Sequence, residues 1–165
     1  MISAVPDPPA ATLLARERQS RLKGSGIRIE QLPGCWMLQQ TWNRNGAAPA
    51  PGTANLLRLL GACLILNNSE HGLSIVNQVS FGGFRLRFSG HAQLKGSRPL
   101  LMFSFTTLEL SWLDWVLLER SLPTPKPQRM PFFALIELND QQGTLTARGR
   151  GGGLAQWSLS KTRNS

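Results

Sequence analysis

The sequence predicts a mainly β protein, an antiparallel barrel of about eight strands with a short N-terminal helix. Short segments in which apolar and polar residues alternate are separated by glycine-rich turns. The order of these segments lacks the strand-helix alternation of a parallel sheet. Because the 165 residues are 41% apolar and 16% charged, they can enclose one core. We therefore expect a tail and short helix over residues 1–26 and one barrel domain over residues 27–162.

The N-terminal region is expected to contribute little regular structure. Residues 5–9 contain three prolines, each of which fixes φ and removes a backbone donor. Thr12 can cap a short helix that runs to about Leu22, and Gly24 and Gly26 can end it.

The first part of the barrel is only partly specified. Residues 35–42 are predicted to form a strand, and a loop over residues 43–53 follows, with an Asn-Gly pair and two prolines. Residues 55–66 suit either a buried strand or a helix, so both alternatives stay open. A turn is expected at Asn67 and Asn68.

The clearest alternation lies in the middle of the chain. Residues 73–79 are predicted to form a strand in which Asn77 and Gln78 fall on opposite faces, so one of the two amides must face inward. Gly82 and Gly83 predict a hairpin turn. In the following strand three apolar side chains are expected inside and two arginines outside, namely Phe84, Leu86 and Phe88 against Arg85 and Arg87.

The second half of the chain holds the remaining strands. Residues 100–110 and 132–138 are predicted strands, with the proline-rich linker 123–131 between them. Residues 111–122 carry both a helical capping pattern and the alternation of a strand, and either structure fits. The last predicted elements are a turn at 139–143, a strand at 144–147, a glycine turn at 151–153 and a strand at 154–160.

The two ends of the barrel domain are expected to meet, because a closed barrel ties its first strand to its last. Trp36 follows Gly34 at the start of the first strand. An indole in this position typically fills the end of the core, with its N–H hydrogen-bonded and a cation over its face. Arg148 and Arg150 point to one face of their strand, so either could be that cation, with Arg148 the first choice. Either arginine could instead bind an anion.

Both ends also resemble one protein family. Residues 32–41, LPGCWMLQQT, and residues 143–152, GTLTARGRGG, are similar to the opening strand and the final strand pair of the plastid lipid-associated proteins, or fibrillins, which are lipocalin-like. By strand order the resemblance covers residues 27–160. The chain lacks tyrosine and a transit segment rich in Ser and Arg, which suits a cyanobacterial-type homologue. The resemblance implies a non-enzymatic protein that binds or organises lipids or isoprenoids at thylakoid membranes or lipid globules.

A barrel of this size can hold one small ligand or be filled by side chains. A hydrophobic ligand such as a lipid, carotenoid or quinone would need an apolar lining with a few polar groups. Ordinary core packing is the alternative for the same residues. The candidate lining residues are Phe84, Leu86, Phe88, Phe103, Phe105 and Asn77.

The basic character of the chain suggests anionic partners. Eighteen Lys and Arg against nine Asp and Glu give a formal net charge of +9, which attracts anionic membranes or nucleic acid. Residues 148–153 alternate Arg and Gly, as in a nucleic-acid-binding segment, although a tight barrel turn accounts for the same pattern. A third hypothesis is an assembly factor for a photosynthetic complex that meets its protein partner through Trp112 and Trp115.

Motifs for chemistry are missing from the sequence. Cys35 and Cys63 lack metal-site spacing and are expected to be buried free thiols. His71 and His91 are expected in turns without neighbouring ligands. No Gly-x-Ser-x-Gly elbow or carboxylate pair stands out, so we expect neither an enzyme nor a bound metal or cofactor. With no signal peptide or membrane span recognised, we expect a cytoplasmic protein, at most peripheral to thylakoid membranes.

Overall fold

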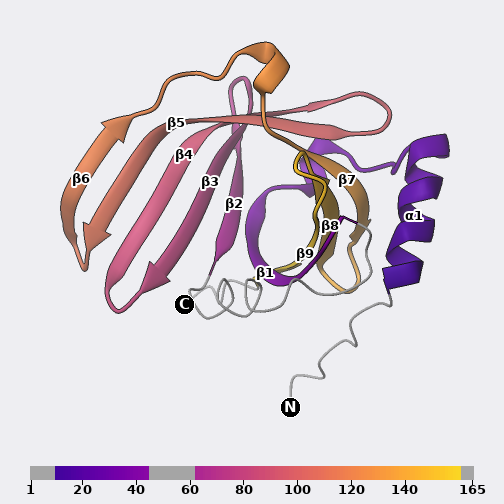
Figure 1. Cartoon of the computed structure of the whole chain (residues 1–165), viewed down its shortest axis with the longest axis horizontal. Helices are drawn as coiled ribbons and strands as arrows, with labels where there is room; N and C mark the ends of the chain where they lie inside the picture. The colour runs from indigo at the N-terminus through magenta and orange to yellow at the C-terminus, as the bar shows by residue number, and fades with distance from the viewer. Residues whose placement is uncertain (1–9, 45–61, 161–165) are drawn as a thin grey trace.

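The computed structural model describes residues 10–44 and 62–160, which form a nine-stranded antiparallel sheet with one α-helix beside it (Figure 1). The predicted mainly β, barrel-like fold with a short N-terminal helix is confirmed. The elements are α1 (Ala10–Lys23), η1 (Ile29–Gln31), β1 (Gly34–Trp42), β2 (Cys63–Ser69), β3 (Gly72–Phe81), β4 (Phe84–Lys95), β5 (Leu100–Trp112), β6 (Trp115–Ser121), η2 (Pro127–Arg129), β7 (Phe132–Asn139), β8 (Thr144–Gly149) and β9 (Leu154–Leu159).

Eight of these strands close into a ring. The strands follow the order β4-β3-β2-β1-β9-β8-β7-β5, and β4 also pairs with β5. The first and last strands are therefore neighbours, as the sequence predicts, with Trp36 opposite Leu159 and Trp42 opposite Leu154. The ninth strand, β6, pairs with β5 and stands outside the ring.

The sheet extends beyond the ring on one side. β4 and β5 have 12 and 13 residues, whereas β8 and β9 have six each. The long strands continue past the ring and, with β6, form an open sheet, seen at the left of Figure 1. We call this extension, residues 77–88 and 105–121, the blade.

Two apolar clusters hold the ring together. The larger lies inside the ring and includes Trp36, Leu66, Ile75 and Trp157. The smaller lies between the ring and α1, and consists of Leu13, Trp42, Ile136 and Leu154, with Leu14 packed against it. β1 contributes to both clusters because its register shifts between Leu38 and Gln40, which changes the side chains facing α1.

Several local predictions need correction. The helix already includes Ala10, two residues before Thr12, although it ends before Gly24 as expected. Asn67 and Asn68 belong to β2, so the predicted turn there is wrong. The turn lies at residues 70–71 instead, directly before Gly72. Gly72 has φ 127°, and a Cβ there would approach the Ala92 carbonyl oxygen to 2.9 Å, so this position favours glycine.

The two segments with open alternatives have different outcomes. Residues 111–122 are not helical. Ser111 lies near the end of β5, the chain turns at residues 113–114, and Trp115–Ser121 forms β6. Pairing with β5 outweighs the helical capping pattern. Of residues 55–66, the last four lie on β2, and the rest fall outside the described residues, as does most of the predicted loop 43–53.

Candidate functional site

The closure of the barrel depends on Gly34 and Trp36. Trp36 is 1% exposed, and its Nε1–H donates a 2.8 Å hydrogen bond to the Leu32 carbonyl oxygen, which satisfies its polar atom inside the core. Gly34 has φ 148°, and a Cβ there would lie 2.5 Å from Leu159 Cδ1. Glycine therefore allows the first strand to approach the last one closely.

The predicted contact between Trp36 and an arginine is corrected by the structure. Ala147 lies in the ring core with Trp36, so the strand alternation turns Arg148 to the outer side. There its Nε and Nη2 donate to the two carboxylate oxygens of Glu17 on α1, each at 2.6 Å. Arg150 is exposed and donates to the carbonyl oxygens of Gln128 and Met130.

The six candidate lining residues do share one face of the sheet. This inner face continues the ring core outward, because Phe103 belongs to the core and Phe105 packs against it. The rings of Phe103 and Phe105 are 5.3 Å apart, and those of Phe105 and Phe88 are 5.5 Å apart. Asn77 pairs with Phe88 in the register, so Asn77, rather than Gln78, is the inward amide. Leu86 and Phe84 continue the row along β4.

Exposure rises along this row. Phe103 is 8% exposed, whereas Phe84 at the hairpin tip is 47% exposed and pairs its ring with Trp112 at 6.2 Å. The row thus leads from the ring core to open surface. Of the ten large apolar residues exposed in the described part of the chain, eight lie on the blade: Phe81, Phe84, Trp112, Leu113, Trp115, Val116, Leu117 and Leu118.

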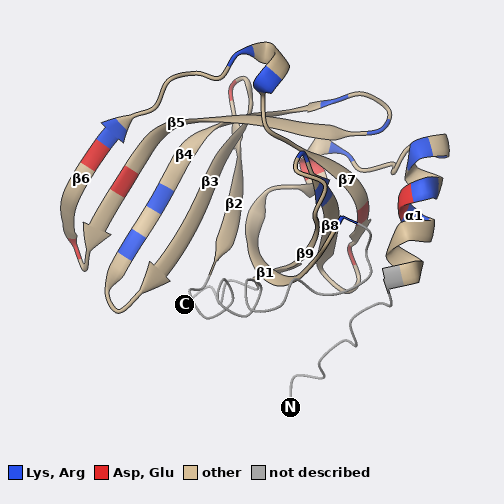
Figure 2. Cartoon of the chain, in the orientation of Figure 1, with Lys and Arg blue, Asp and Glu red and all other residues tan. Residues whose placement is uncertain are grey.

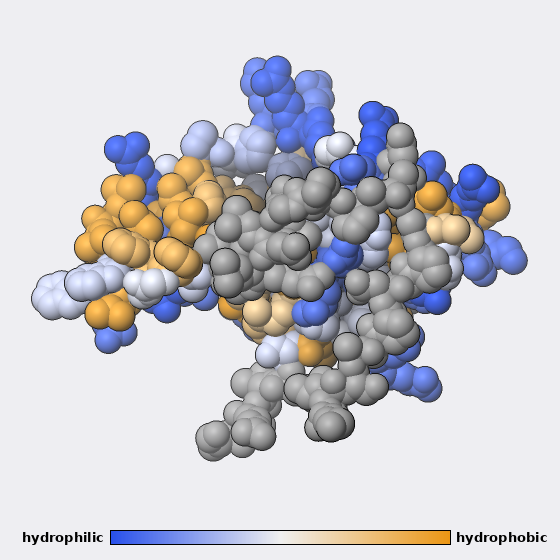
Figure 3. Space-filling view, turned by 60° about the horizontal axis from the view of Figure 1, so that its bottom comes forward, coloured by the Kyte–Doolittle hydropathy of each residue, from blue (hydrophilic) through white to orange (hydrophobic). Residues whose placement is uncertain are grey.

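The blade has two different faces. On the inner face, Leu108 and Leu110 of β5 pair with Phe88 and Leu86, and Leu118 of β6 pairs with Leu110. Figure 3 shows apolar side chains gathered at this end of the molecule. On the outer face the register places charged residues side by side across β4, β5 and β6 (Figure 2): Arg87, Glu109 and Glu119.

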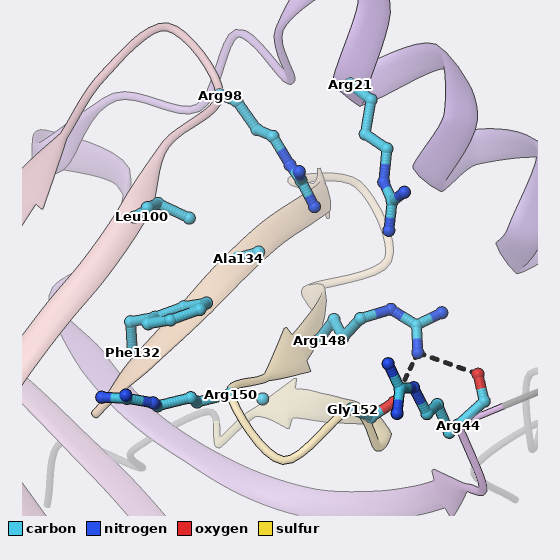
Figure 4. A pocket seen from close by; sticks show the side chains of 10 residues that line it. Arg21, Arg44, Arg98, Leu100, Phe132, Ala134, Arg148, Arg150 and Gly152 are labelled. Carbon is cyan, nitrogen blue, oxygen red and sulfur yellow. Dashed lines mark hydrogen bonds between the residues drawn. The ribbon is translucent and has the colours of Figure 1, made fainter. Parts of the chain in front are cut away.

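A second feature, which sequence reasoning missed, lies beside α1. A pocket of about 440 Å³ is lined by five arginines, Arg21, Arg44, Arg98, Arg148 and Arg150, together with Leu100, Phe132, Ala134, Gly149 and Gly152 (Figure 4). The arginines are far apart in the sequence, so no motif announces them. Sequence reasoning singled out two of them, Arg148 and Arg150, as candidates to cover Trp36 or to bind an anion, but it did not indicate the other three.

Glu17 is the carboxylate at the edge of this pocket. It is 4% exposed and accepts hydrogen bonds from Arg148 and from Arg21, the latter at 2.9 Å. The bond from Arg148 lowers the pKa of Glu17 below its ordinary value, against the opposing effect of burial. Glu17 thus stays ionised and holds α1 against β8.

The structure places the cysteines and histidines in different settings. Both cysteines are free thiols, and Cys63 is buried as predicted, whereas Cys35 is only half-buried. Burial, with Cys35 nearby, raises the pKa of Cys63 to about 11. His71 lies in a turn as predicted, but His91 lies on β4. Within residues 10–44 and 62–160 no three His, Cys, Asp or Glu side chains gather as a metal site would require. In the same residues no helix has the length and apolar character needed to cross a membrane.

Comparison with known proteins gave no matching family model and no matching curated protein. The resemblance to the fibrillins therefore stays a prediction from the two motifs.

Proposed function

We propose that the protein is a non-enzymatic lipid- or isoprenoid-binding protein that holds the hydrocarbon part of its ligand on the inner face of the blade. The observation that carries this proposal is the uninterrupted apolar row from Phe103 in the core to Phe84 and Trp112 at the tips. Soluble proteins rarely expose a continuous apolar surface of this kind unless it contacts another molecule.

The physical basis is the transfer of hydrocarbon out of water. Each buried CH₂ group contributes about 0.8 kcal/mol, so a ligand chain of about ten methylenes gains roughly 8 kcal/mol before the cost of association. Asn77, inward and exposed, offers the face a polar group for a headgroup or a carbonyl. Trp112 and Trp115 combine an apolar body with an N–H, which suits the boundary between lipid and water.

The location proposed for this activity is the surface of an anionic membrane, such as the thylakoid. The net charge of +9 favours such a surface, and the resemblance to the fibrillins favours the same setting. The nucleic-acid alternative has less support, because its Arg-Gly segment forms a tight turn, in which Gly152 N–H donates to the Gly149 carbonyl oxygen at 2.9 Å.

The test is ligand recovery and uptake. Mild organic extraction of the purified protein, followed by mass spectrometry, should yield a hydrophobic compound, and the stripped protein should take up a carotenoid, quinone or fatty acid saturably. Replacing Leu118 on the inner face by Ser should weaken uptake, while Val116→Ala on the outer face should not. Failure of both extraction and saturable uptake would contradict the proposal.

A second candidate function is favoured by β6 itself. All seven residues of β6 are exposed, and its edge away from β5 has no partner strand among the described residues. Such an edge with Trp115 beside it can pair with a strand of another protein, as an assembly factor would require. Replacing Trp112 and Trp115 by Ala should then abolish pull-down of a partner from cell extract while the domain stays folded. Retained pull-down would count against this candidate.

A further inference from the structure

The arginine pocket lies apart from the blade and brings together distant parts of the chain. Arg21 comes from the last turn of α1, Arg44 follows β1 and Arg98 lies between β4 and β5. Arg148 is the second-last residue of β8, and Arg150 lies in the turn after it. In Figure 4 the Arg21, Arg98 and Arg148 side chains extend toward a common region beside Ala134. The Arg150 side chain extends to the other side, below Phe132. The fold thus brings arginines from five positions to the wall of one pocket.

One carboxylate, Glu17, cannot balance these charges. It binds Arg148 and Arg21 and lies 4.0 Å from Arg98. Among the described residues, no other acidic side chain lines the pocket or pairs with one of its arginines. Guanidinium groups that line one pocket repel one another, and a bound anion would offset that cost. The pocket therefore carries an excess of positive charge with a place for a negative group.

Most of the donors in the pocket remain available. Each guanidinium has five N–H donors. Arg148 uses nearly all of its donors in hydrogen bonds to Glu17 and to the carbonyl oxygens of Gly152 and Arg44. It therefore fixes the positions of these groups around the pocket. Arg150 is held by two carbonyl oxygens with donors to spare. Within residues 10–44 and 62–160, the Arg44 guanidinium forms no hydrogen bond or ion pair.

The rest of the pocket wall is apolar. Leu100, Phe132 and Ala134 line it, and Ala134 is 3% exposed. A ligand with a charged group and an adjoining apolar part would therefore meet matching surfaces. The arginines form one compact recess instead of a long row, which fits a single small group better than a nucleic-acid backbone.

We propose that this pocket binds a phosphate-class anion, carried either by the headgroup of an anionic lipid or by a free phosphorylated small molecule. Planar guanidinium forks match phosphate oxygens in pairs, and several positive groups favour a multiply charged anion over a single carboxylate. Arg44, Arg98, Arg21 and Arg150 supply the donors, and Arg148 with Glu17 fixes the frame.

The first experiment is calorimetric titration of the full chain with pyrophosphate, with ionic strength held constant by chloride. Saturable binding is expected. The double variant Arg44→Gln/Arg98→Gln should lose about tenfold or more in affinity. Its matched control is Arg18→Gln/Arg120→Gln, which removes the same charge from exposed positions outside the pocket and should bind like the wild type. Absence of binding, or an equal loss in the control, would overturn the proposal.

Two further arms separate the sources of the anion. Glycerol phosphate in solution stands for the free molecule, and phosphatidylcholine vesicles with and without phosphatidic acid stand for the lipid. Arginine-dependent binding of glycerol phosphate supports the first source, and arginine-dependent binding of phosphatidic acid vesicles alone supports the second. If neither depends on Arg44 and Arg98, the ligand is neither of these sources and the proposal is wrong.

These measurements are independent of the proposed function. The blade variant Leu118→Ser should keep pyrophosphate affinity, because Leu118 does not line the pocket. The pocket variant Arg44→Gln/Arg98→Gln should keep uptake of an uncharged carotenoid. If the wild type takes up carotenoid but does not bind pyrophosphate, the pocket proposal has failed. If it binds pyrophosphate but takes up no hydrophobic ligand, the proposed function has failed.

Discussion

The ring and the blade are built from the same strands but have opposite environments. In the ring each strand has a neighbour on both sides, and Leu66, Leu73 and Leu101 are fully buried. In the blade, β6 has one neighbouring strand among the described residues, and Trp115 is 74% exposed. Apolar content alone therefore does not locate the core of this protein. Closure of the ring decides which apolar side chains stabilise the fold and which face outward.

Truncating one tryptophan in each region should have very different effects on stability. Trp36→Ala should lower the free energy of unfolding by about 4 kcal/mol, because it opens a cavity in the ring core. Trp115→Ala should change it by less than about 0.5 kcal/mol, since an exposed side chain loses little packing. Urea unfolding followed by circular dichroism measures both. Similar losses in the two variants would show that the blade is part of the cooperative core.

The second prediction concerns the attachment of α1 to the ring. Glu17→Gln leaves Arg148, whose side chain is 14% exposed, without its counter-ion, and should cost about 3 kcal/mol. Glu70→Gln in the exposed β2–β3 turn is the matched control and should be nearly neutral. A difference of less than about 1 kcal/mol between the two would contradict the role given to this pair.

The same pair predicts a pH dependence. Because the folded-state pKa of Glu17 lies below its ordinary value of 4.5, its stabilisation is complete above that pH. The contribution is lost as the pH falls through the folded-state pKa. The stability difference between wild type and Glu17→Gln should therefore shrink below pH 4.5 in urea titrations across the acid range. A difference that grows on acidification would have the wrong sign.

A third prediction tests the closeness of the first and last strands. Gly34→Ala should cost about 2 kcal/mol, since it adds a side chain at positive φ next to Leu159. Gly151→Ala should cost little, because the space around that position is open. Thermal unfolding of both variants gives the comparison. Equal stability of the two would mean that the strands adjust to the added methyl group.

The smallest expected effect on stability is on the outer face of the blade. Val116→Ala should stay within about 0.5 kcal/mol of the wild type, because Val116 is 56% exposed. Amide hydrogen exchange then sharpens the contrast: β6 amides should exchange much faster than those of β1 and β9, which lie between two strands each. Equal protection of these strands would show that ring and blade open together.

The sequence predicts the local turns and strands of this fold well where single residues determine the backbone. Gly82 and Gly83 have φ values of 56° and 85°, as a primed hairpin turn requires, and the predicted hairpin is present. The row of Phe84, Leu86 and Phe88 is on one face as predicted, because alternation is a local property. The turn predicted at Asn67 and Asn68 is wrong because both residues pair with β3, opposite Ser74 and Leu73.

Long-range pairs were beyond the reach of local patterns. Arg148 was expected near Trp36, but its partner Glu17 lies 131 positions away on the N-terminal helix. Alternation along β8 could have indicated this in part, because a core position for Ala147 places Arg148 on the outer face. The pocket is also a long-range feature, because Arg21, Arg44 and Arg98 line it together only in the folded, closed ring. No spacing in the sequence indicates that meeting.

The closure of the ring has one short seam. Among the described residues, β5 pairs with β7 through Leu100, Leu101 and Met102, whereas its register with β4 runs from Phe84 to Lys95 along nearly its whole length. A mechanical load across this seam would therefore separate β5 from β7 more easily than β5 from β4. The cylinder would unroll there into a curved sheet, with its remaining hairpins still joined.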